Sequence, residues 1–331
     1  MGRALLIIAR LLAALLVAGV AVWGALALWY RLPGPGLAGS AAAALWLLAS
    51  LIALYALLGS RWRPLIAYAA LFAAILVWWA GIAPRNDKDW APDVARSLTG
   101  EVEGHELHLA NVRDFDWRSE TQVAERWEDA SFDLDDLESL DLFASYWGGP
   151  SIAHTIISFG FKDGRHLAFS VEVRRRRGEA YSTIAGLFKE DELAIIAATE
   201  RDVVRVRSNV RGEDVRLFRL RVTPEEARRA LVALVEEAND IAARPRFYDT
   251  LTTNCTTVLL QLARRLGRAL PFDWRIMLTG YLPDYGYDQG LLDRDLPLAE
   301  LRERGRIRER ALAADAGGDF SRLIREGVPG P

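Results

Sequence analysis

The chain of 331 residues has one cysteine and four histidines, and its basic residues are almost all arginine. A single cysteine excludes an internal disulfide, and an idle thiol is a liability in an oxidising compartment. No long basic stripe with interleaved aromatic residues occurs, so we expect no nucleic-acid partner. Residues 174–177 are four consecutive arginines, which fit a solvated strand end or, alternatively, a contact with anionic lipid. No internal repeat is present.

Long apolar runs are absent after Ala83, but three precede it. Residues 4–30 are apolar except for Arg10, and residues 37–59 and 64–83 carry no charge. Each run reaches the roughly 20 residues that span a bilayer. Residues 1–83 are therefore predicted to form a three-helix transmembrane anchor. A cleaved signal peptide is the alternative for the first run, but two further spans that follow at once disfavour it.

The arginines that flank these runs predict an orientation. With the N-terminus in the cytoplasm, the inner side holds more of them than the outer side, which has only Arg31. The inner arginines are then Arg3, Arg10, Arg61 and Arg63, and the aromatic residues of the outer belt are Trp29, Tyr30, Trp78 and Trp79. This topology places everything after Ala83 outside the cytoplasm, with the chain crossing the membrane several times.

The part beyond the membrane is predicted to be an α+β domain. Residues 84–103 are expected to be a linker, 104–295 the domain, and 296–331 a charged helix and C-terminal tail. Runs such as "HELHLANVRDFDW", "VVRVRSNV" and "VRLFRLRV" favour strands, the last two pairing around Arg211-Gly212-Glu213. Thr223 and Pro224 are typical of a helix start, and that helix should run to about residue 242. Residues 298–314 are predicted to form a solvated surface helix.

The only cysteine lies in "LTTNCTTVLLQLARRLG", where a polar run meets an apolar stripe at helical spacing. Thr253 or Asn254 is a suitable N-cap, and Gly267 is a suitable stop. Cys255 therefore falls in the first turn of a predicted helix, where the backbone N–H groups and the helix dipole favour a thiolate. A buried structural cysteine is the alternative.

The four histidines differ in their suitability as a base for that thiol. His105 and His108 lie three apart on a predicted strand, so they point to opposite faces and lack the spacing of a helical zinc pair. We therefore expect no metal site. His154 and His166 lie on "IAHTIISFGFKDGRHLAFSVEVR", which has the pattern of a β-hairpin. A lone histidine on a strand is more often structural, so register decides between the two interpretations.

The loop Lys162-Asp163-Gly164 fits a three-residue hairpin loop closed by a left-handed glycine. Phe161 then pairs with Arg165, and His154 faces Glu172. His154, His166, Ser170 and Glu172 would project from one side of the sheet. A two-residue Asp-Gly loop would instead move Glu172 to the other face. On the favoured register the carboxylate orients one ring nitrogen and leaves the other for the thiol. His166 is the alternative orienting group.

Four segments together resemble the Lnb N-terminal periplasmic domain family, over roughly residues 105–285. They are "NVRDFDWRSE", "YWGGPSIAHTIISFGFKDGRHLAFSVEVRRRRGEAYS", "GLFKEDELAIIAATERDVVRVR" and "RPRFYDTLTTNCTT". Members are bacterial membrane-anchored proteins, and the family takes its name from a lipoprotein N-acyltransferase. The resemblance implies a permuted papain-like cysteine-enzyme domain, in which the histidine strand precedes the cysteine helix. His154 and Cys255 follow that order.

The resemblance implies roles for the motif residues. Cys255 would be the nucleophile, His154 the base and Glu172 the third catalytic member. Residues that would bind substrate or an oxyanion are Asn254, Thr256, Ser170 and Tyr248. It also implies a location in the bacterial inner membrane with the domain in the periplasm. One departure is that the chain ends soon after this domain, so the family name does not fix the substrate.

Three functions follow from these expectations. The first is a periplasmic thiol acyltransferase or hydrolase that acts on membrane lipids or lipoproteins through an acyl-enzyme. The second is a cysteine peptidase or amidase of the cell wall, with the same catalytic residues. The third is a non-catalytic, membrane-tethered binding module, in which the thiol titrates near 8.5. None of the three requires a cofactor.

Overall fold

The computed structural model describes residues 2–32, 37–254, 256, 258, 271, 273–315 and 317–330. The chain divides into two compact units. The first, the membrane unit, comprises Met1–Arg85 and Ser182–Glu190. The second, the sheet unit, comprises Asn86–Tyr181 and Asp191–Pro331. Each unit is described separately below.

The membrane unit contains three helices, α1 (Gly2–Arg31), α2 (Leu37–Leu58) and α3 (Trp62–Ala80), each long and apolar enough to cross a bilayer. Among the described residues, the prediction of three long apolar helices that could span a membrane is confirmed. Buried polar groups join the helices: Trp46 Nε1 donates to the carbonyl of Ala21 at 3.1 Å, and the hydroxyls of Ser50 and Tyr68 lie 3.0 Å apart. Such bonds suit a bundle in lipid, where polar groups find no water.

Ser182–Glu190 belongs to the membrane unit although it lies far from the three helices in sequence. The ring of Phe188 stacks on Tyr30 with centroids 5.7 Å apart. Lys189 Nζ donates to the carbonyl of Trp79 at 2.9 Å. Arg31 and Glu190 form an ion pair at 3.6 Å. This segment, which includes the short helix Ala185–Leu187, therefore packs on residues at the C-terminal ends of α1 and α3.

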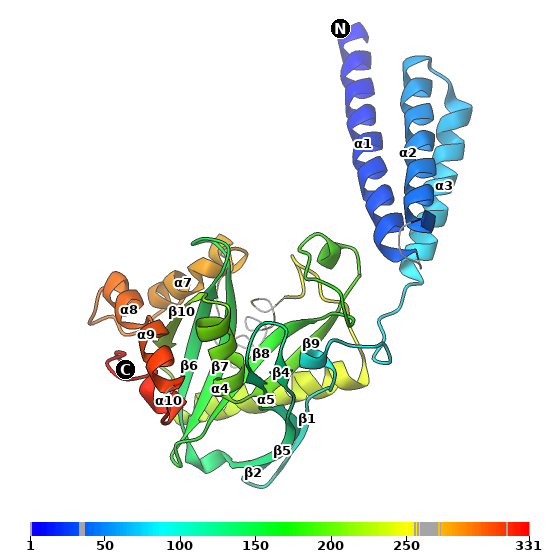
Figure 1. Ribbon diagram of the computed structural model, residues 1–331. Helices are drawn as coiled ribbons and strands as arrows, with labels where there is room; N and C mark the ends of the chain where they lie inside the picture. The colour runs from blue at the N-terminus through cyan, green and yellow to red at the C-terminus, as the bar shows by residue number, and fades with distance from the viewer. Residues whose placement is uncertain are drawn as a thin grey trace. The chain divides into compact units, whose positions relative to one another are not determined.

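The sheet unit is built on one mixed sheet of eight strands in the order β1-β2-β9-β8-β7-β6-β10, with β5 also paired to β2 (Figure 1). Its pairs are antiparallel except β2 with β9. The strands are β1 (Thr99–Glu103), β2 (Glu106–Arg113), β5 (Trp127–Asp133), β6 (Leu137–Tyr146), β7 (Ala153–Phe161), β8 (His166–Arg174), β9 (Glu192–Ala198) and β10 (Asp214–Arg219), beside a small pair, β3 (Asp116–Trp117) and β4 (Val123–Ala124).

The β7–β8 hairpin has the predicted register. Gly164 adopts φ +86°, and Phe161 exchanges backbone hydrogen bonds with Gly164 and Arg165 across the three-residue loop. The paired residues further along are Gly160 with His166, Ser158 with Ala168, and Ile156 with Ser170. The two-residue loop is therefore excluded, and every second residue of both strands, including His154 and Glu172, shares a face.

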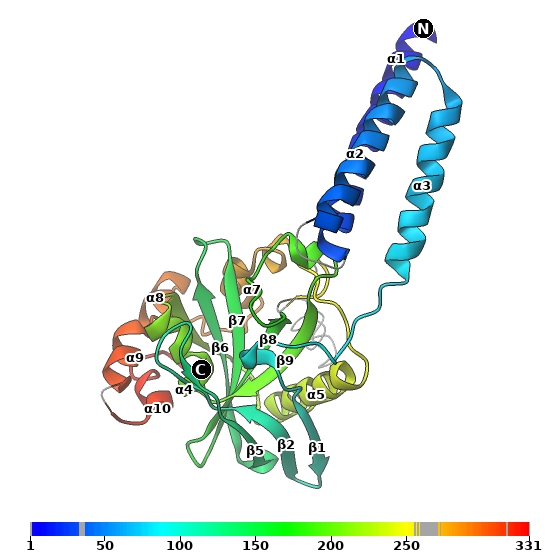
Figure 2. The same ribbon diagram turned by 45° about the vertical axis from the view of Figure 1, so that its right-hand side comes forward.

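Helices cover both faces of this sheet (Figures 1 and 2). The α5 face packs against α5 (Pro224–Ala243) through a large apolar core that includes Ile157, Phe169 and Leu231. The opposite face, here called the α9 face, packs against α4 (Glu200–Val203), α9 (Arg308–Asp315) and α10 (Phe320–Leu323) through Phe143 and Ile156. Both faces are buried, which confirms the predicted α+β class with a sheet packed by helices.

Two predicted elements agree with the structure, and one predicted strand is wrong. The helix expected from Pro224 is α5, and it opens with a capping box between Thr223 and Glu226. The run "VRLFRLRV" contains β10. Residues 203–210, predicted as its partner strand, instead form the end of α4 and a π-helical turn, Val206–Val210. The alternating valines mimic a strand, but Val203 and Val204 instead pack into the α9-face core.

The predicted ends of the domain also differ from the structure. Trp90 and Leu98, within the expected linker, are buried, and the last five linker residues form β1. The expected surface helix over residues 298–314 is two helices, α8 (Leu298–Arg304) and α9, separated at Gly305. A Cβ at Gly305 would lie 2.5 Å from the carbonyl of Leu217, so the chain can pass β10 there only with glycine. The C-terminal stretch completes the α9-face core, and α7 (Leu282–Asp288) precedes it.

Candidate active site

The imidazole of His154 lies at the second position of β7, on the α9 face. Its Nε2 is 2.6 Å from the hydroxyl of Ser170, and that hydroxyl donates to Glu172 Oε1 at 2.7 Å. Nε2 is also 3.3 Å from the same carboxylate oxygen. The hydroxyl has one hydrogen and gives it to the carboxylate, so it accepts from Nε2–H. The hydrogen-bond chain therefore fixes the tautomer that leaves a lone pair on Nδ1.

That lone pair is what a general base requires. Within the described part of the chain, Nδ1 of His154 makes no hydrogen bond, while Nε2 is fully occupied. The side chains of His154 and Glu172 are 14% and 20% exposed, so a reactant can reach them although most of their surface is buried. The arrangement can accept a proton at Nδ1 and place the resulting positive charge beside a carboxylate.

Arg207 is a member of this cluster that the sequence did not indicate. Its Nη2 donates to Glu172 Oε1 at 3.0 Å, and its Nη1 lies 3.7 Å from Glu213 Oε2. Ser145, which pairs with His154 across β6 and β7, donates to Glu213. Arg207 therefore joins two carboxylates behind the imidazole. It comes from the π-helical turn, and the strand predicted there gave no signal of such a role.

Burial and Arg207 determine the protonation of the two titrating groups. Burial, and then the charge of Arg207, lower the pKa of His154 below 6.5, although Glu172 opposes this. Burial alone would raise the pKa of Glu172, but the charges of His154 and Arg207 and the hydrogen bond from Ser170 hold that pKa well below its usual range. At neutral pH the site therefore contains a neutral imidazole, an ionised carboxylate and an arginine cation.

The segment that contains the cysteine is described only on either side of it. Asn254 Oδ1 accepts from the backbone N–H of Thr256 at 3.0 Å, and the Asn254 carbonyl accepts from Val258 N at 3.1 Å. Thr256 and Val258 are helical, so Asn254 is the N-cap of the predicted helix. Cys255, Thr257 and the predicted helix end at Gly267 lie outside the described residues, as does the predicted contact between the thiol and His154.

The loop before Asn254 is fixed to the end of the sheet that carries His154. Leu193 N donates to the carbonyl of Arg246 at 2.8 Å, and Tyr248 N donates to that of Asp191 at 3.0 Å. Both bonds are at the start of β9, beside the C-terminal end of β8 and the N-terminal end of β7. The path of the chain therefore brings the start of the cysteine helix to the same end of the sheet as His154.

The segment around Asn254 and the imidazole of His154 lie on opposite faces of the sheet at that end. Tyr248 and Val258 pack into the α5-face core, whereas the ring of His154 projects from the α9 face. His154 is only one residue from the start of β7, where the sheet ends.

The other predicted site residues have definite environments. Ser170 connects His154 to Glu172 instead of facing a substrate. Thr256 is fully buried and its backbone N–H is used by the cap, and Tyr248 is 8% exposed. His166 pairs with Gly160 near the hairpin loop, where its Nδ1 lies 3.1 Å from the carbonyl of Gly164. The structure brings Glu172, not His166, to His154. In the described ranges no cluster of three or more potential metal ligands occurs.

A sheet with helices on both faces, joined to three helices able to span a bilayer, defines a membrane protein with an extramembrane α+β domain. Residues 124–280 match the family model of the Lnb N-terminal periplasmic domain, the family that the sequence resembles. The match includes β6–β10, α5 and the cysteine motif. A search of curated proteins found no match, and neither did a search of solved structures.

Proposed function

We propose that this protein is a membrane-anchored periplasmic cysteine enzyme that transfers or hydrolyses acyl groups of lipids or lipoproteins. Cys255 is the nucleophile, His154 the base and Glu172 the orienting carboxylate. The observation that carries the proposal is the chain from Nε2–H of His154 through Ser170 to Glu172, because it leaves Nδ1 as the proton acceptor. A histidine kept neutral by burial and by Arg207 is a base at neutral pH.

The proposed reaction has two steps. Nδ1 of His154 takes the proton of the Cys255 thiol, and the thiolate attacks the acyl carbonyl carbon. The ester C–O bond breaks, the leaving oxygen takes the proton from Nδ1, and a thioester remains. An amine or water then gives its proton to Nδ1 and attacks the thioester carbon, the C–S bond breaks, and Cys255 is released as thiolate. Glu172 stabilises the imidazolium in both steps.

Three features support this function over a purely structural site. Asn254 caps the helical turn that contains Thr256 and Val258, and a helix start favours a thiolate. His154 and Glu172 remain partly exposed, unlike a core ion pair. The three apolar helices and the match to a periplasmic-domain family support a location close to membrane lipids.

Intact mass of the full-length protein after incubation with native phospholipid tests the proposal. Wild type should gain one acyl mass on Cys255, and both Cys255→Ala and His154→Gln should gain none. Full acyl-transfer activity in Cys255→Ala would refute it. A thiol-directed probe that is displaced by muropeptide but not by phospholipid would instead assign the site to cell-wall amide chemistry.

A further inference from the structure

Six apolar side chains are exposed around one end of the sheet unit, the end that carries His154. They are 39–57% exposed and come from the β6–β7 turn, the segment 274–278 and the end of the segment that follows β8. We call them the apolar rim: Trp147, Ile152, Tyr181, Trp274, Met277 and Leu278. Contiguous exposed apolar groups of this size are uncommon on soluble surfaces and mark binding surfaces.

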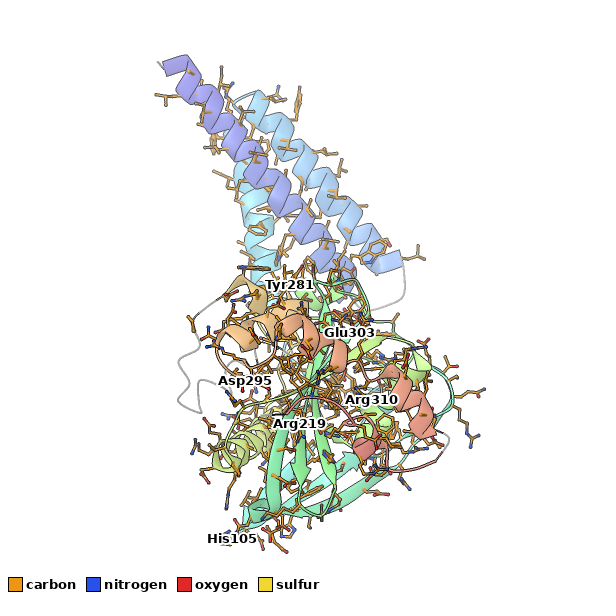
Figure 3. All side chains as sticks on the ribbon, turned by 90° about the vertical axis from the view of Figure 1, so that its left-hand side faces the viewer. His105, Arg219, Tyr281, Asp295, Glu303 and Arg310 are labelled. Carbon is orange, nitrogen blue, oxygen red and sulfur yellow. The ribbon has the colours of Figure 1, made fainter. Side chains whose placement is uncertain are left out.

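The rim rests on a fixed framework. Gly280 N donates to the carbonyl of Ser151 at 3.1 Å, and Ala153 N donates to Thr279 Oγ1 at 2.9 Å. A Cβ at Gly280 would lie 2.1 Å from the carbonyl of Pro150, so the two segments approach as closely as backbone allows. Figure 3 labels Tyr281, beside this framework, at the opposite end of the domain from His105. The exposed side chains are therefore held outward by ordered backbone.

Chain continuity connects the rim to the membrane unit. The rings of Trp147 and Tyr181 pack edge to face with centroids 6.2 Å apart. Tyr181 directly precedes Ser182–Glu190, whose Phe188 stacks on Tyr30 at the C-terminal end of a membrane helix. That segment exposes two more apolar side chains, Ile184 at 52% and Leu187 at 36%. A rim residue is thus one peptide bond from a segment that packs on the transmembrane helices.

We propose that the apolar rim inserts into the headgroup–acyl boundary of the membrane that α1–α3 cross. Tryptophan and tyrosine favour this boundary because their rings are apolar and their N–H or O–H groups remain hydrated. Burying apolar groups at this depth is how interfacial elements attach to a bilayer. The rim borders the strand end at His154, so its insertion brings that end of the sheet to the lipid surface. The inference does not depend on catalysis.

The attachment is apolar rather than electrostatic. Arg275, the cation within the rim segment, is bound by Asp273 at 2.8 Å and Asp288 at 2.6 Å. Of the arginine run, Arg174 is buried, and Arg175 and Arg177 form ion pairs with Asp93 and Asp89. Insertion should therefore be unchanged by salt and by the fraction of anionic lipid, in contrast to a polybasic contact.

Site-specific fluorescence on the full chain tests this proposal. Cys255→Ser removes the only cysteine, and Ile152→Cys or Leu278→Cys then carries an environment-sensitive NBD label in vesicles of phosphatidylethanolamine and phosphatidylglycerol. Val102→Cys is the matched control, because Val102 is apolar and 39% exposed but lies on β1. Spin-labelled lipid should quench most of the fluorescence at both rim positions, at low and high salt, and leave the control unquenched.

Each possible result decides the question. Quenching at both rim positions but not at Val102 supports insertion. An absence of quenching at either rim position, or equal quenching at Val102, overturns it, and quenching that disappears in high salt replaces it with an electrostatic contact. Because every protein tested lacks Cys255, the result is independent of whether the acyl-transfer proposal is correct.

Discussion

The hydroxyl of Ser170 determines which nitrogen of His154 can act as a base. It accepts from Nε2–H and donates to Glu172, so the ring cannot rotate or change tautomer without breaking a hydrogen bond. This chain of hydrogen bonds therefore fixes the orientation of the imidazole as well as its charge. Removing the hydroxyl should leave a histidine that is present but less well oriented.

Ser170→Ala should lower kcat about fivefold, since one hydrogen bond contributes roughly 1 kcal/mol and about 1.4 kcal/mol is a factor of ten. KM should change little. Ser158→Ala is the matched control, because Ser158 lies on the same face of the same hairpin but donates to Glu200. Steady-state kinetics of acyl transfer provide the measurement, and an equal loss of kcat in both variants would contradict the orienting role.

Arg207→Gln should move the acidic limb of the pH–rate profile to higher pH. The pKa of His154 is lowered first by burial and then by Arg207, so removing that cation raises the pKa and protonates the base at a higher pH. The shift is measured as kcat/KM against pH. Arg205→Gln is the control, because Arg205 pairs with Asp315 instead. An unchanged acidic limb in Arg207→Gln would show that Arg207 does not lower the pKa of His154.

Sequence reasoning found some of these residues and missed others for a physical reason. His154, Ser170 and Glu172 are related by hairpin register, which a local loop with Gly164 determines. Arg207 reaches Glu172 from 35 positions away, through a turn whose shape depends on packing against the sheet. No local pattern encodes such a contact.

At the scale of elements, the C-terminal segment is joined to the sheet by a buried cation. Arg325, just after α10, donates to Glu200 at 2.5 and 2.7 Å and to Asp141 at 2.9 Å. Burial alone would raise the pKa of Glu200, but Arg325 and the hydrogen bond from Ser158 lower it from 4.5 to about 2. This shift corresponds to about 3 kcal/mol of stability, which is present above pH 4.5 and lost as the pH falls towards 2.

Arg325→Met should lower the free energy of unfolding of the sheet unit by about 3–5 kcal/mol, because it leaves the buried carboxylate of Glu200 without its cation and leaves Asp141 with Arg219 alone. Arg322→Met, in the same segment, removes an exposed pair with Glu326 and should cost less than about 1 kcal/mol. Denaturant unfolding of the full chain in detergent at pH 7 gives both values. Similar losses in the two variants would show that Arg325 is not a specific clamp.

Elements with local signals were predictable and elements formed by packing were not. The α5 capping box and the β7–β8 loop are each determined by a few adjacent residues. In contrast, the turn Val206–Val210 alternates like a strand but is helical, and its Val206 packs against Phe115 and Trp117. The split of residues 298–314 depends on the close approach of Gly305 to Leu217, which no sequence period reveals.

At the scale of the whole molecule, the proposed function requires the sheet unit to be in the periplasm. We expect Val102→Cys, in a Cys255→Ser background, to react with a membrane-impermeant maleimide in spheroplasts. Arg63→Cys, in the first turn of α3, should react only after the membrane is permeabilised, because the positive-inside rule assigns that end of the helix to the cytoplasm. The reverse pattern of labelling would show the opposite topology, in which the sheet unit is cytoplasmic and cannot reach periplasmic substrates.

The proposed function requires that Cys255 and His154 act together. The rate of alkylation of Cys255 by iodoacetamide, measured against pH in the full-length protein, tests this most directly. In wild type the thiol should titrate below about 7.5, and in His154→Gln its pKa should rise towards about 8.5, because the base is lost and only the helix start still favours the thiolate. The same titration near 8.5 in both proteins would contradict the pairing and leave Cys255 a structural thiol.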